Sequence, residues 1–344
     1  MSDELNDLNE VVLSRRDVFK TLGTTAVAGA LLASAGFDPA MAQELKASAS
    51  PIKCAMSNAG LQASWCAQGK TAAEAWSKLM NVEMTWFDGE LSATKQRATI
   101  DNMATQKWDF VAVQTFGIGT LNDPMSRVIE AGTPVIAMDT MMAPEGQLAI
   151  HTFIAPDNIM MGAVTATALL QAIGGVGQVA MTQGALGHSG AQGRAKGFMQ
   201  VLANFPNVEL VDEQPADWDV TKVARIWDSL LTKFPDLKAG FFHNDDMALA
   251  AGNVIKAKGR EGILLSGIDA MPPAVSAVLE GSLVATVRNP SCRIHGWSVA
   301  AGVAAAVGGE KAGTDIPAFI LADGPVITKD TAAGHLWLQK NFLI

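Results

Sequence analysis

The sequence predicts an α/β protein made of two doubly wound lobes, each with a parallel sheet covered by helices. Short apolar runs alternate with amphipathic stretches at intervals of about 25–30 residues, as in βαβ units. Several of the runs, such as Phe110–Val113 and Ala239–Phe242, are continuously apolar, which is typical of strands buried on both faces. The chain has 344 residues, 49% of them apolar, and this is enough for two domains with their own cores.

The predicted strands and helices alternate from residue 52 onward. The apolar runs read as strands are Ile52–Met56, Val82–Phe87, Phe110–Val113, Pro134–Met138, Thr152–Ala155, Gln178–Thr182, Val208–Val211, Ala239–Phe242, Ile263–Ser266 and Leu283–Val287. The amphipathic stretches between them include Ala93–Thr105, Asn158–Ile173, Ala191–Phe205, Thr221–Lys233 and Met247–Lys258. Residues 328–344 read as a further short helix packed on the outside of a lobe.

Charge and cysteine content exclude several classes of protein. The net charge of −9 argues against nucleic-acid binding, which needs a basic face. Cys54, Cys66 and Cys292 are too few for a disulfide framework, and no CxxC or Cys/His cluster suggests zinc. We expect no metal and no cofactor. Cys54 in a strand and Cys66 in the following helix are expected to be small buried residues.

The first 42 residues are typical of an export signal. Ser14–Lys20 resembles the twin-arginine pattern S-R-R-x-F-L-K, with Val18 in the usual place of Phe. The uncharged residues 21–37 follow, and then Ala40–Ala42 forms an A-x-A cleavage site. A membrane anchor is the alternative, but 17 residues are short for a span of about 20. We expect a periplasmic mature protein, not inserted in the membrane, with a linker at 43–50.

Polar side chains follow most of the predicted strands. They are Ser57-Asn58, Gln114, Asp139, Gln183, Asn244, Asp269 and Arg288-Asn289. Parallel α/β sheets bind ligands beyond the carboxyl ends of their strands. Any strand must end in something polar, but turns alone favour Gly, Pro and Ser, whereas these are mostly amides and carboxylates. The pattern therefore favours a binding site at these ends.

Three motifs near the C-terminal end are the most specific. The segment Asn244–Leu249 reads N-D-x-x-A-L, Gly267–Asp269 reads G-x-D, and Gly281–Thr286 reads G-x-L-x-A-T. Together they resemble the ribose/galactose class of periplasmic substrate-binding proteins. Earlier segments agree in order and spacing, so the resemblance covers about residues 51–326.

The resemblance implies the type I periplasmic binding protein fold, two Rossmann-like lobes joined by three hinge crossings. The crossings are expected near Ala155, near Asn289 and at residues 317–320. The N-terminal lobe would comprise 51–155 plus 290–318, and the C-terminal lobe 156–289 plus 319–344. The implied function is capture of a small neutral sugar or polyol and its delivery to the permease of an ABC importer. We expect a monomer.

The resemblance also implies which residues lie in the cleft. It places Trp65, Asp139, Trp218, Asn244, Asp269 and Asn289 there, with Ser57, Asn58, Ser64, Thr140 and Gln192 as further candidates. Carboxylates and amides bind hydroxyl groups, and aromatic rings cover the apolar face of a sugar. Each has an alternative role: the aspartates as helix N-caps, Asn244 as an ordered turn residue, the tryptophans as core.

Two departures from the family bear on the ligand. Many members have Arg after the residue that corresponds to Asp139, where this chain has Thr140. A second ligand-binding Arg of the family corresponds to Gln192, and Arg194 aligns with a position that makes no contact. Loss of two guanidinium groups removes bidentate donors. The hypothesis is a ligand with fewer or differently placed hydroxyls than ribose, or an open-chain polyol.

The sequence also bears on two other functions, an enzyme and a ligand sensor. Gly187–Gly190 is close to a G-x-S-x-G nucleophile elbow, but Ala191 replaces the last Gly. Asp139 and Asp269 could form a glycosidase-like pair, yet they would lie on opposite lobes of a moving hinge. We therefore expect no enzyme. A ligand sensor for chemotaxis or quorum signalling on the same fold stays open, because the sequence does not separate signalling from import.

Overall fold

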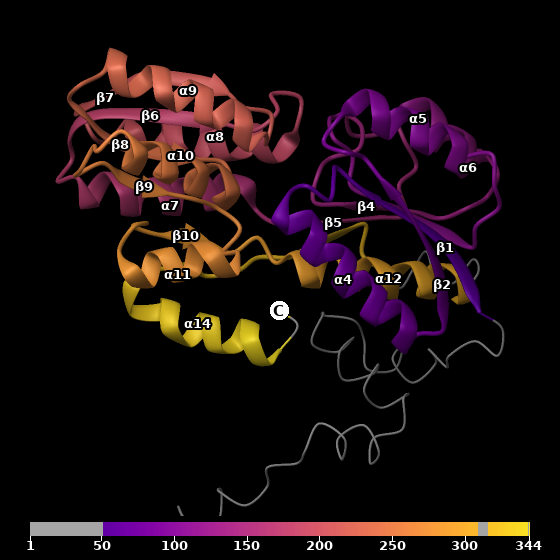
Figure 1. Cartoon of the computed structure of the whole chain (residues 1–344). Coiled ribbons are helices and arrows are strands. Elements are labelled where there is room, and N and C mark those ends of the chain that lie inside the picture. The colour runs from indigo at the N-terminus through magenta and orange to yellow at the C-terminus, as the bar shows by residue number, and fades with distance from the viewer. Residues whose placement is uncertain (1–50, 309–315, 343) are drawn as a thin grey trace, which may run out of the picture.

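The computed structural model describes residues 51–308, 316–342 and 344, and it contains two α/β lobes side by side (Figure 1). The expected signal peptide and the linker at 43–50 lie outside the described residues. Among the residues described, no helix has the length and apolar character needed to cross a bilayer.

The first lobe is built on a six-stranded parallel sheet with the order β11-β5-β4-β3-β1-β2. Its strands are β1 (Ile52–Asn58), β2 (Val82–Asp88), β3 (Phe110–Val113), β4 (Val135–Met138), β5 (Thr152–Ala155) and β11 (Phe319–Leu321). Its helices are α4 (Ser64–Leu79), α5 (Ala93–Met103), α6 (Asn122–Glu130) and α12 (Ser291–Gly308).

Alternate residues of the central strands enter two different cores. Met56 and Phe110 pack in a cluster with Trp297 of α12, whereas Val111 packs in another with Met125 of α6. Successive strand side chains point to opposite faces, so a continuously apolar strand serves both layers. This arrangement is why the apolar runs showed no alternation in the sequence.

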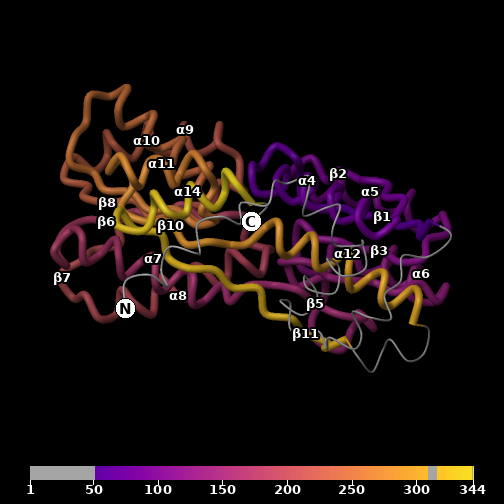
Figure 2. The backbone as a smooth tube through the Cα atoms, turned by 90° about the horizontal axis from the view of Figure 1, so that it is seen from below, coloured from indigo at the N-terminus to yellow at the C-terminus, as the bar shows by residue number. Residues whose placement is uncertain are grey.

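The second lobe has a four-stranded parallel sheet with the order β7-β6-β8-β9 and a short antiparallel pair, β10 with β12. The strands are β6 (Val176–Gln183), β7 (Asn207–Pro215), β8 (Leu237–Phe242), β9 (Leu264–Ser266), β10 (Thr286–Val287) and β12 (Val326–Ile327). The helices are α7 (Asn158–Ala172), α8 (Ser189–Leu202), α9 (Val220–Lys233), α10 (Asp245–Ala257), α11 (Pro272–Glu280) and α14 (Lys329–Asn341). Helix α14 packs on α11, which assigns the C-terminal helix to this lobe (Figure 2).

The chain passes between the lobes at three places. The first follows β5 and the second follows β10, near the expected Ala155 and Asn289. The third lies between β11 and β12, so the expected crossing at 317–320 is wrong by a few residues. Ile320 of β11 pairs with Ile154 of β5, and this pairing keeps residues 319–321 in the first lobe. The crossing is made by residues 322–325.

The predicted strands all overlap observed ones, but the last was drawn too long. Of the run Leu283–Val287, only Thr286 and Val287 form a strand, and their partner β12 is antiparallel. β11 and β12 were not predicted, because three and two residues are too short to show a period.

Candidate ligand-binding site

The strands of both sheets end at a small cavity between the lobes, with a volume of about 40 Å³. Its lining residues come from both lobes and from one crossing. They are Ala59, Ala63, Trp65, Cys66, Leu91, Gln114 and Asp139 from the first lobe, His188, Arg194, Trp218, Asn244 and Asp269 from the second, and Asn289 from the crossing. A space of this size admits a few water molecules or one small ligand.

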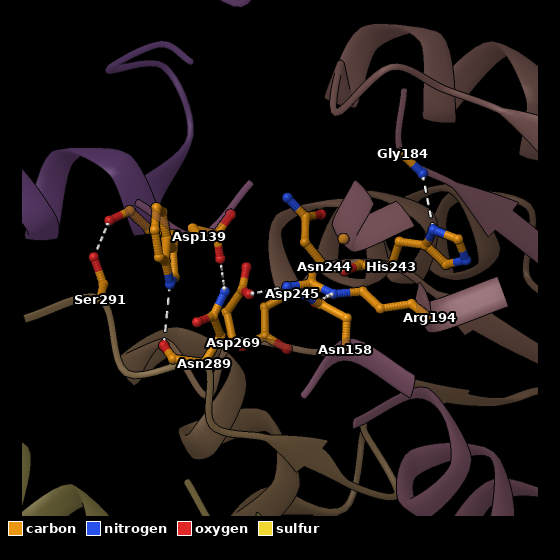
Figure 3. A network of polar contacts seen from close by, with 12 residues as sticks. Asp139, Asn158, Gly184, Arg194, His243, Asn244, Asp245, Asp269, Asn289 and Ser291 are labelled. Atoms are coloured by element: carbon orange, nitrogen blue, oxygen red, sulfur yellow. Dashed lines mark hydrogen bonds and ion pairs between the residues drawn. The ribbon is translucent and has the colours of Figure 1, made fainter. Parts of the chain in front are cut away.

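Asp139 follows β4 in an unusual backbone conformation. Its φ of 55° lies in the left-handed region, which costs a non-glycine residue about 1 kcal/mol or more. Its carboxylate accepts a hydrogen bond from Asn289 Nδ2 at 2.9 Å (Figure 3). A second donor is Gln114 Nε2 at 2.8 Å. Thr140 Oγ1 is a further donor at 3.3 Å. Three neutral donors thus satisfy the hydrogen-bonding capacity of the buried Asp139 side chain.

His188 joins the two lobes beside Asp139. Its Nδ1 accepts a hydrogen bond from the N–H of Gly190 at the start of α8, which assigns the ring proton to Nε2. Nε2 lies 2.5 Å from Thr140 Oγ1 and 3.8 Å from Asp139 Oδ2. Burial lowers the pKa of His188 to about 4, against the opposing effect of Asp139, so the ring is neutral at pH 7.

Arg194 reaches the cavity from the inner face of α8. Its Nε donates to Asn158 Oδ1 at 3.0 Å and its Nη1 donates to the carbonyl of His243. Its Nη2 lies 3.6 Å from Asp269 Oδ1 (Figure 3). The guanidinium also sits 5.8 Å from the centre of the Trp218 ring, within reach of a cation–π interaction.

The expectation for Gln192 and Arg194 is corrected by this helix. Gln192 is exposed, and its Nε2 donates to the carbonyl of Leu186 at 2.9 Å. The buried positions of α8 are Gly190, Ala191, Arg194, Gly197 and Phe198. This 3–4 residue spacing turns Arg194 inward and Gln192 outward. The helical period therefore places the Arg194 guanidinium on the buried face of α8, contrary to the expectation from the family resemblance.

Asn244 and Asp245 organise the start of α10. Asn244 caps the helix, because its Oδ1 accepts from the N–H of Met247 at 2.9 Å. Its Nδ2 has no hydrogen-bond partner among the described residues and remains available to a ligand in the cavity. Asp245 is fully buried and accepts from Met271 N and Thr286 Oγ1, both at 2.7 Å. Burial raises the pKa of Asp245 to about 7.

Asp269 also sits in a strained loop. Its φ is 124° and that of the following Ala270 is 52°. Its N–H donates to the carbonyl of Val287 at 2.8 Å, which holds the loop against β10. Burial raises the pKa of the Asp269 carboxyl well above its ordinary range, and nearby Arg194 opposes that rise. Positive φ at Asp139 and Asp269 alike aims strand-end carboxyls at one cavity.

Two tryptophans form walls of the cavity. Trp65 is held by its Nε1–H, which donates to the carbonyl of Asn289 at 3.0 Å, and by the His295 ring 5.0 Å away. Trp218 packs edge-on against His188 at 5.1 Å and has a φ of 66°. A Cβ at Gly184 would lie 2.1 Å from the Trp218 ring, so this glycine makes room for the indole.

The structure brings together six of the eleven expected site residues in the lining, namely Trp65, Asp139, Trp218, Asn244, Asp269 and Asn289. The other five lie around the cavity. Ser57 accepts a hydrogen bond from Gln96, Asn58 donates to the carbonyl of Cys66, Thr140 contacts His188, Ser64 lies on the rim, and Gln192 is exposed.

The expectation also missed lining residues. Gln114 had been recognised at a strand end, and His188 had been considered only as part of a possible nucleophile elbow. Leu91 carried no signal, because an apolar residue in a loop does not reveal what it covers. His243 is fully buried behind Asn244, and its Nδ1 accepts from Gly184 N at 3.2 Å.

The cysteines and potential metal ligands add no reactive site. Each of the three cysteines, all within the described residues, is a buried free thiol. Burial raises the pKa of Cys54 to about 12 and that of Cys66 still further, which disfavours the reactive thiolate. The part of the chain that the structure describes contains no group of three His, Cys, Asp or Glu side chains able to hold a metal ion.

The comparison with known families decides which family this fold and site represent. The family described as "Periplasmic binding protein domain" matches residues 54–311, three quarters of the chain. The chain belongs to this family. Among curated relatives, this periplasmic binding protein is 27% identical to a xylitol-binding protein of Mycolicibacterium smegmatis over 272 residues, covering 78% of this chain and 74% of the relative.

Other relatives and solved structures agree with the family. A ribose import binding protein of Salmonella typhimurium is 28% identical over 64% of this chain and 73% of its own length. A solved galactofuranose binding protein superimposes with a TM-score of 0.79 at 23% identity, covering 86% of this chain and all of its own. A Mycobacterium smegmatis ABC transporter solute binding protein with bound glycerol gives 0.76 at 25% identity, covering 83% and 96%.

Proposed function

We propose that this periplasmic binding protein captures a small neutral polyol or sugar in the cavity between its lobes and delivers it, chemically unchanged, to the permease of an ABC importer. The observation that carries the proposal is the composition of the cavity. Strand-end amides and carboxylates from both lobes surround one space walled by two indole rings. Relatives named for xylitol, ribose and D-allose binding support the ligand class.

The unused polar groups of the cavity favour hydroxyl groups. Asn244 Nδ2 is a donor and Asn289 Oδ1 an acceptor, and neither has a partner among the described residues. Asp269 and Arg194 add an acceptor and a donor close together. A hydroxyl both donates and accepts, so vicinal hydroxyls match such alternating groups. An anionic ligand would instead face two carboxyl groups.

The size of the cavity favours a short ligand. His188 and Leu91 occupy space at its edge, and about 40 Å³ remains. Arg194 supplies a guanidinium group to the cavity, contrary to our expectation from the sequence. We therefore propose an open-chain polyol of a few carbons, or a small sugar, ahead of a hexopyranose.

A thermal-shift screen of residues 43–344 tests the ligand class. The panel contains glycerol, erythritol, xylitol, ribose, galactose and sugar acids, because a ligand that binds the folded state raises its melting temperature by mass action. We expect short polyols to give the largest shifts. Preference for ribose or galactose would refute the polyol assignment, and no shift with any neutral sugar or polyol would refute the function. Loss of uptake of the best ligand on deleting the gene would separate import from signalling.

We further propose that the twin-arginine pathway exports the protein to the periplasm. The motif Ser14–Lys20 and the A-x-A site at Ala40–Ala42 support this route. The test is the double substitution Arg15→Lys with Arg16→Lys in the full chain. We expect the precursor to accumulate in the cytoplasm, whereas unchanged export would exclude the pathway.

A further inference from the structure

We propose that Asp246 of the second lobe caps helix α4 of the first lobe, and that this cap in trans stabilises the closed form from outside the ligand cavity. Asp246 is thus a positioning residue, and the inference rests on the proposed function in that closure retains the ligand. We call the contact between Ser64 and Asp246 the clasp.

Helix α4 lacks a cap of its own. Its N-cap residue is Ala63, and within the described chain no side chain of the first lobe caps the helix and no acidic residue occupies its first turn. The first N–H groups of a helix have no partner inside it, and its N-terminus carries partial positive charge. Alanine is a poor N-cap because it offers no acceptor.

The second lobe supplies the missing acceptor. Asp246 Oδ2 accepts from the N–H of Ser64 at 2.8 Å, and Oδ1 accepts from Ser64 Oγ at 2.7 Å. Both carboxylate oxygens therefore engage the first residue of α4, across a sequence separation of 182 residues. A carboxylate at a helix N-terminus combines hydrogen bonding with a favourable interaction with the helix dipole.

Several of the described helices are capped by a side chain of their own lobe, whereas α6 and α11 have no side-chain hydrogen bond at the N-cap. Ser92 caps α5, Asp157 caps α7, Asp219 caps α9 and Asn244 caps α10, each through a side-chain oxygen. For α4 the acceptor is present only when the lobes meet. The unpaired N–H of Ser64 therefore favours the closed form over the open one.

The clasp lies next to the cavity on both sides. Asp246 is two residues after Asn244, and Ser64 immediately precedes Trp65, and both neighbours line the cavity. Asp245, between Asn244 and Asp246, ties this turn to Met271 and Thr286 of the loop region that holds Asp269. Closure on a ligand therefore brings the clasp partners together as the cavity forms.

The opposite rim is closed differently. There the N–H of Met141 donates to Ser189 Oγ at 2.9 Å, and the N–H of Ile118 donates to the carbonyl of Gly187 at 2.9 Å. These are neutral hydrogen bonds, which contribute less than a charge-assisted one. We therefore expect the clasp to stabilise the closed form more than the two hydrogen bonds at the opposite rim do.

The test measures lobe closure directly. Spin labels at Lys78→Cys on α4 and Lys256→Cys on α10, both exposed positions, report the distance between lobes by pulsed EPR, while the native thiols are buried. Xylitol is the probe, titrated to saturation. The variants are Asp246→Ala, Asp246→Asn and Ser64→Ala. Asp219→Ala is the control, because it removes a helix cap in the same lobe that has no cross-lobe partner.

If the clasp stabilises the closed form, Asp246→Ala raises the xylitol concentration for half-closure roughly tenfold. Asp246→Asn has a smaller effect because it keeps an acceptor, and Ser64→Ala does so because it keeps the backbone N–H. The control matches the wild type. An unchanged midpoint in Asp246→Ala would overturn the proposal.

The distance distributions of the ligand-free protein test the clasp independently of the ligand assignment. If xylitol closes no variant, the proposed ligand fails, and the ligand-free distance distributions then decide about the clasp. A short-distance population in the wild type that Asp246→Ala reduces supports it. Identical distributions overturn it.

Discussion

The side-chain amide of Asn289 donates to Asp139 Oδ1 at 2.9 Å (Figure 3), and the backbone carbonyl of the same residue accepts from Trp65 Nε1 at 3.0 Å. Asn289 follows β10 at a crossing between the lobes, so one hinge residue orients two cavity residues of the first lobe. Its Oδ1 has no partner among the described residues and is left for a ligand. The hinge and the cavity between the lobes thus share a residue.

We expect Asn289→Ala to weaken ligand binding by about 1–3 kcal/mol, because Asp139 loses a donor and the ligand loses an acceptor. Isothermal titration with the best ligand of the thermal-shift screen measures the change. Ser291→Ala is the control, since it removes the contacts of Ser291 Oγ with the backbone carbonyl of Trp65 and the His295 ring but no side chain that lines the cavity. Equal effects of the two substitutions would contradict a direct role of the Asn289 side chain.

The corrected orientation of α8 gives a paired prediction. Arg194→Lys keeps the charge but loses the planar fork that reaches Asn158, His243 and Asp269, so binding should weaken by about 1–3 kcal/mol. Gln192→Ala should change affinity by no more than about 0.5 kcal/mol, because its side chain is exposed. Melting temperatures establish that both variants fold. The reverse order of effects would restore the alignment-based assignment.

Trp218 should contribute as a ring that covers the apolar face of the ligand. Trp218→Ala is expected to weaken binding by about 1–3 kcal/mol while the protein remains folded. Ligand-induced quenching of tryptophan fluorescence should also decrease in this variant. Trp337→Ala is the control, since Trp337 is 59% exposed on α14. Wild-type affinity in Trp218→Ala would remove this residue from the site.

Ligand binding should weaken in acid because of His188. In the closed protein burial lowers its pKa to about 4, with Asp139 opposing and Arg194 reinforcing the shift, whereas an exposed ring has the ordinary value of 6.5. The neutral ring favours closure fully above pH 6.5, and this contribution is lost as the pH falls toward 4. Affinity at pH 5.5 should be about tenfold lower than at pH 7.5.

His188→Asn tests the origin of this pH dependence. Asparagine preserves an N-cap for α8 but does not titrate in this range. We expect the affinity of the variant to vary less between pH 7.5 and 5.5 than that of the wild type. An unchanged pH profile would assign the effect to another group.

Much of the fold was predictable because burial restricts which residue types a segment can contain. Strands covered on both faces must be apolar throughout, so β3, β4 and residues 239–242 of β8 appeared as uninterrupted apolar runs. The third crossing was misplaced because β11 has only three residues, and what decides its lobe is pairing with β5, a contact between residues far apart in the sequence.

The lining of the cavity was predictable where residue type and strand end coincide, as at Asp139, Asn244 and Asp269. The family resemblance predicted Gln192 in the cleft, but the helical period of α8 turns this side chain outward. His188 was missed for another reason: its role is to bridge the lobes through Thr140, and no pattern within either segment records that contact.

The sequence by itself determined the class of fold, the edge of each sheet that carries polar groups, and the motifs of the family. These properties follow from local periodicity and from the direction of parallel strands. The tertiary structure decided which polar groups meet, because cavity and clasp combine residues far apart along the chain. Asp246 reads locally as an ordinary first-turn residue of α10, and only the packing of two lobes makes it the cap of α4.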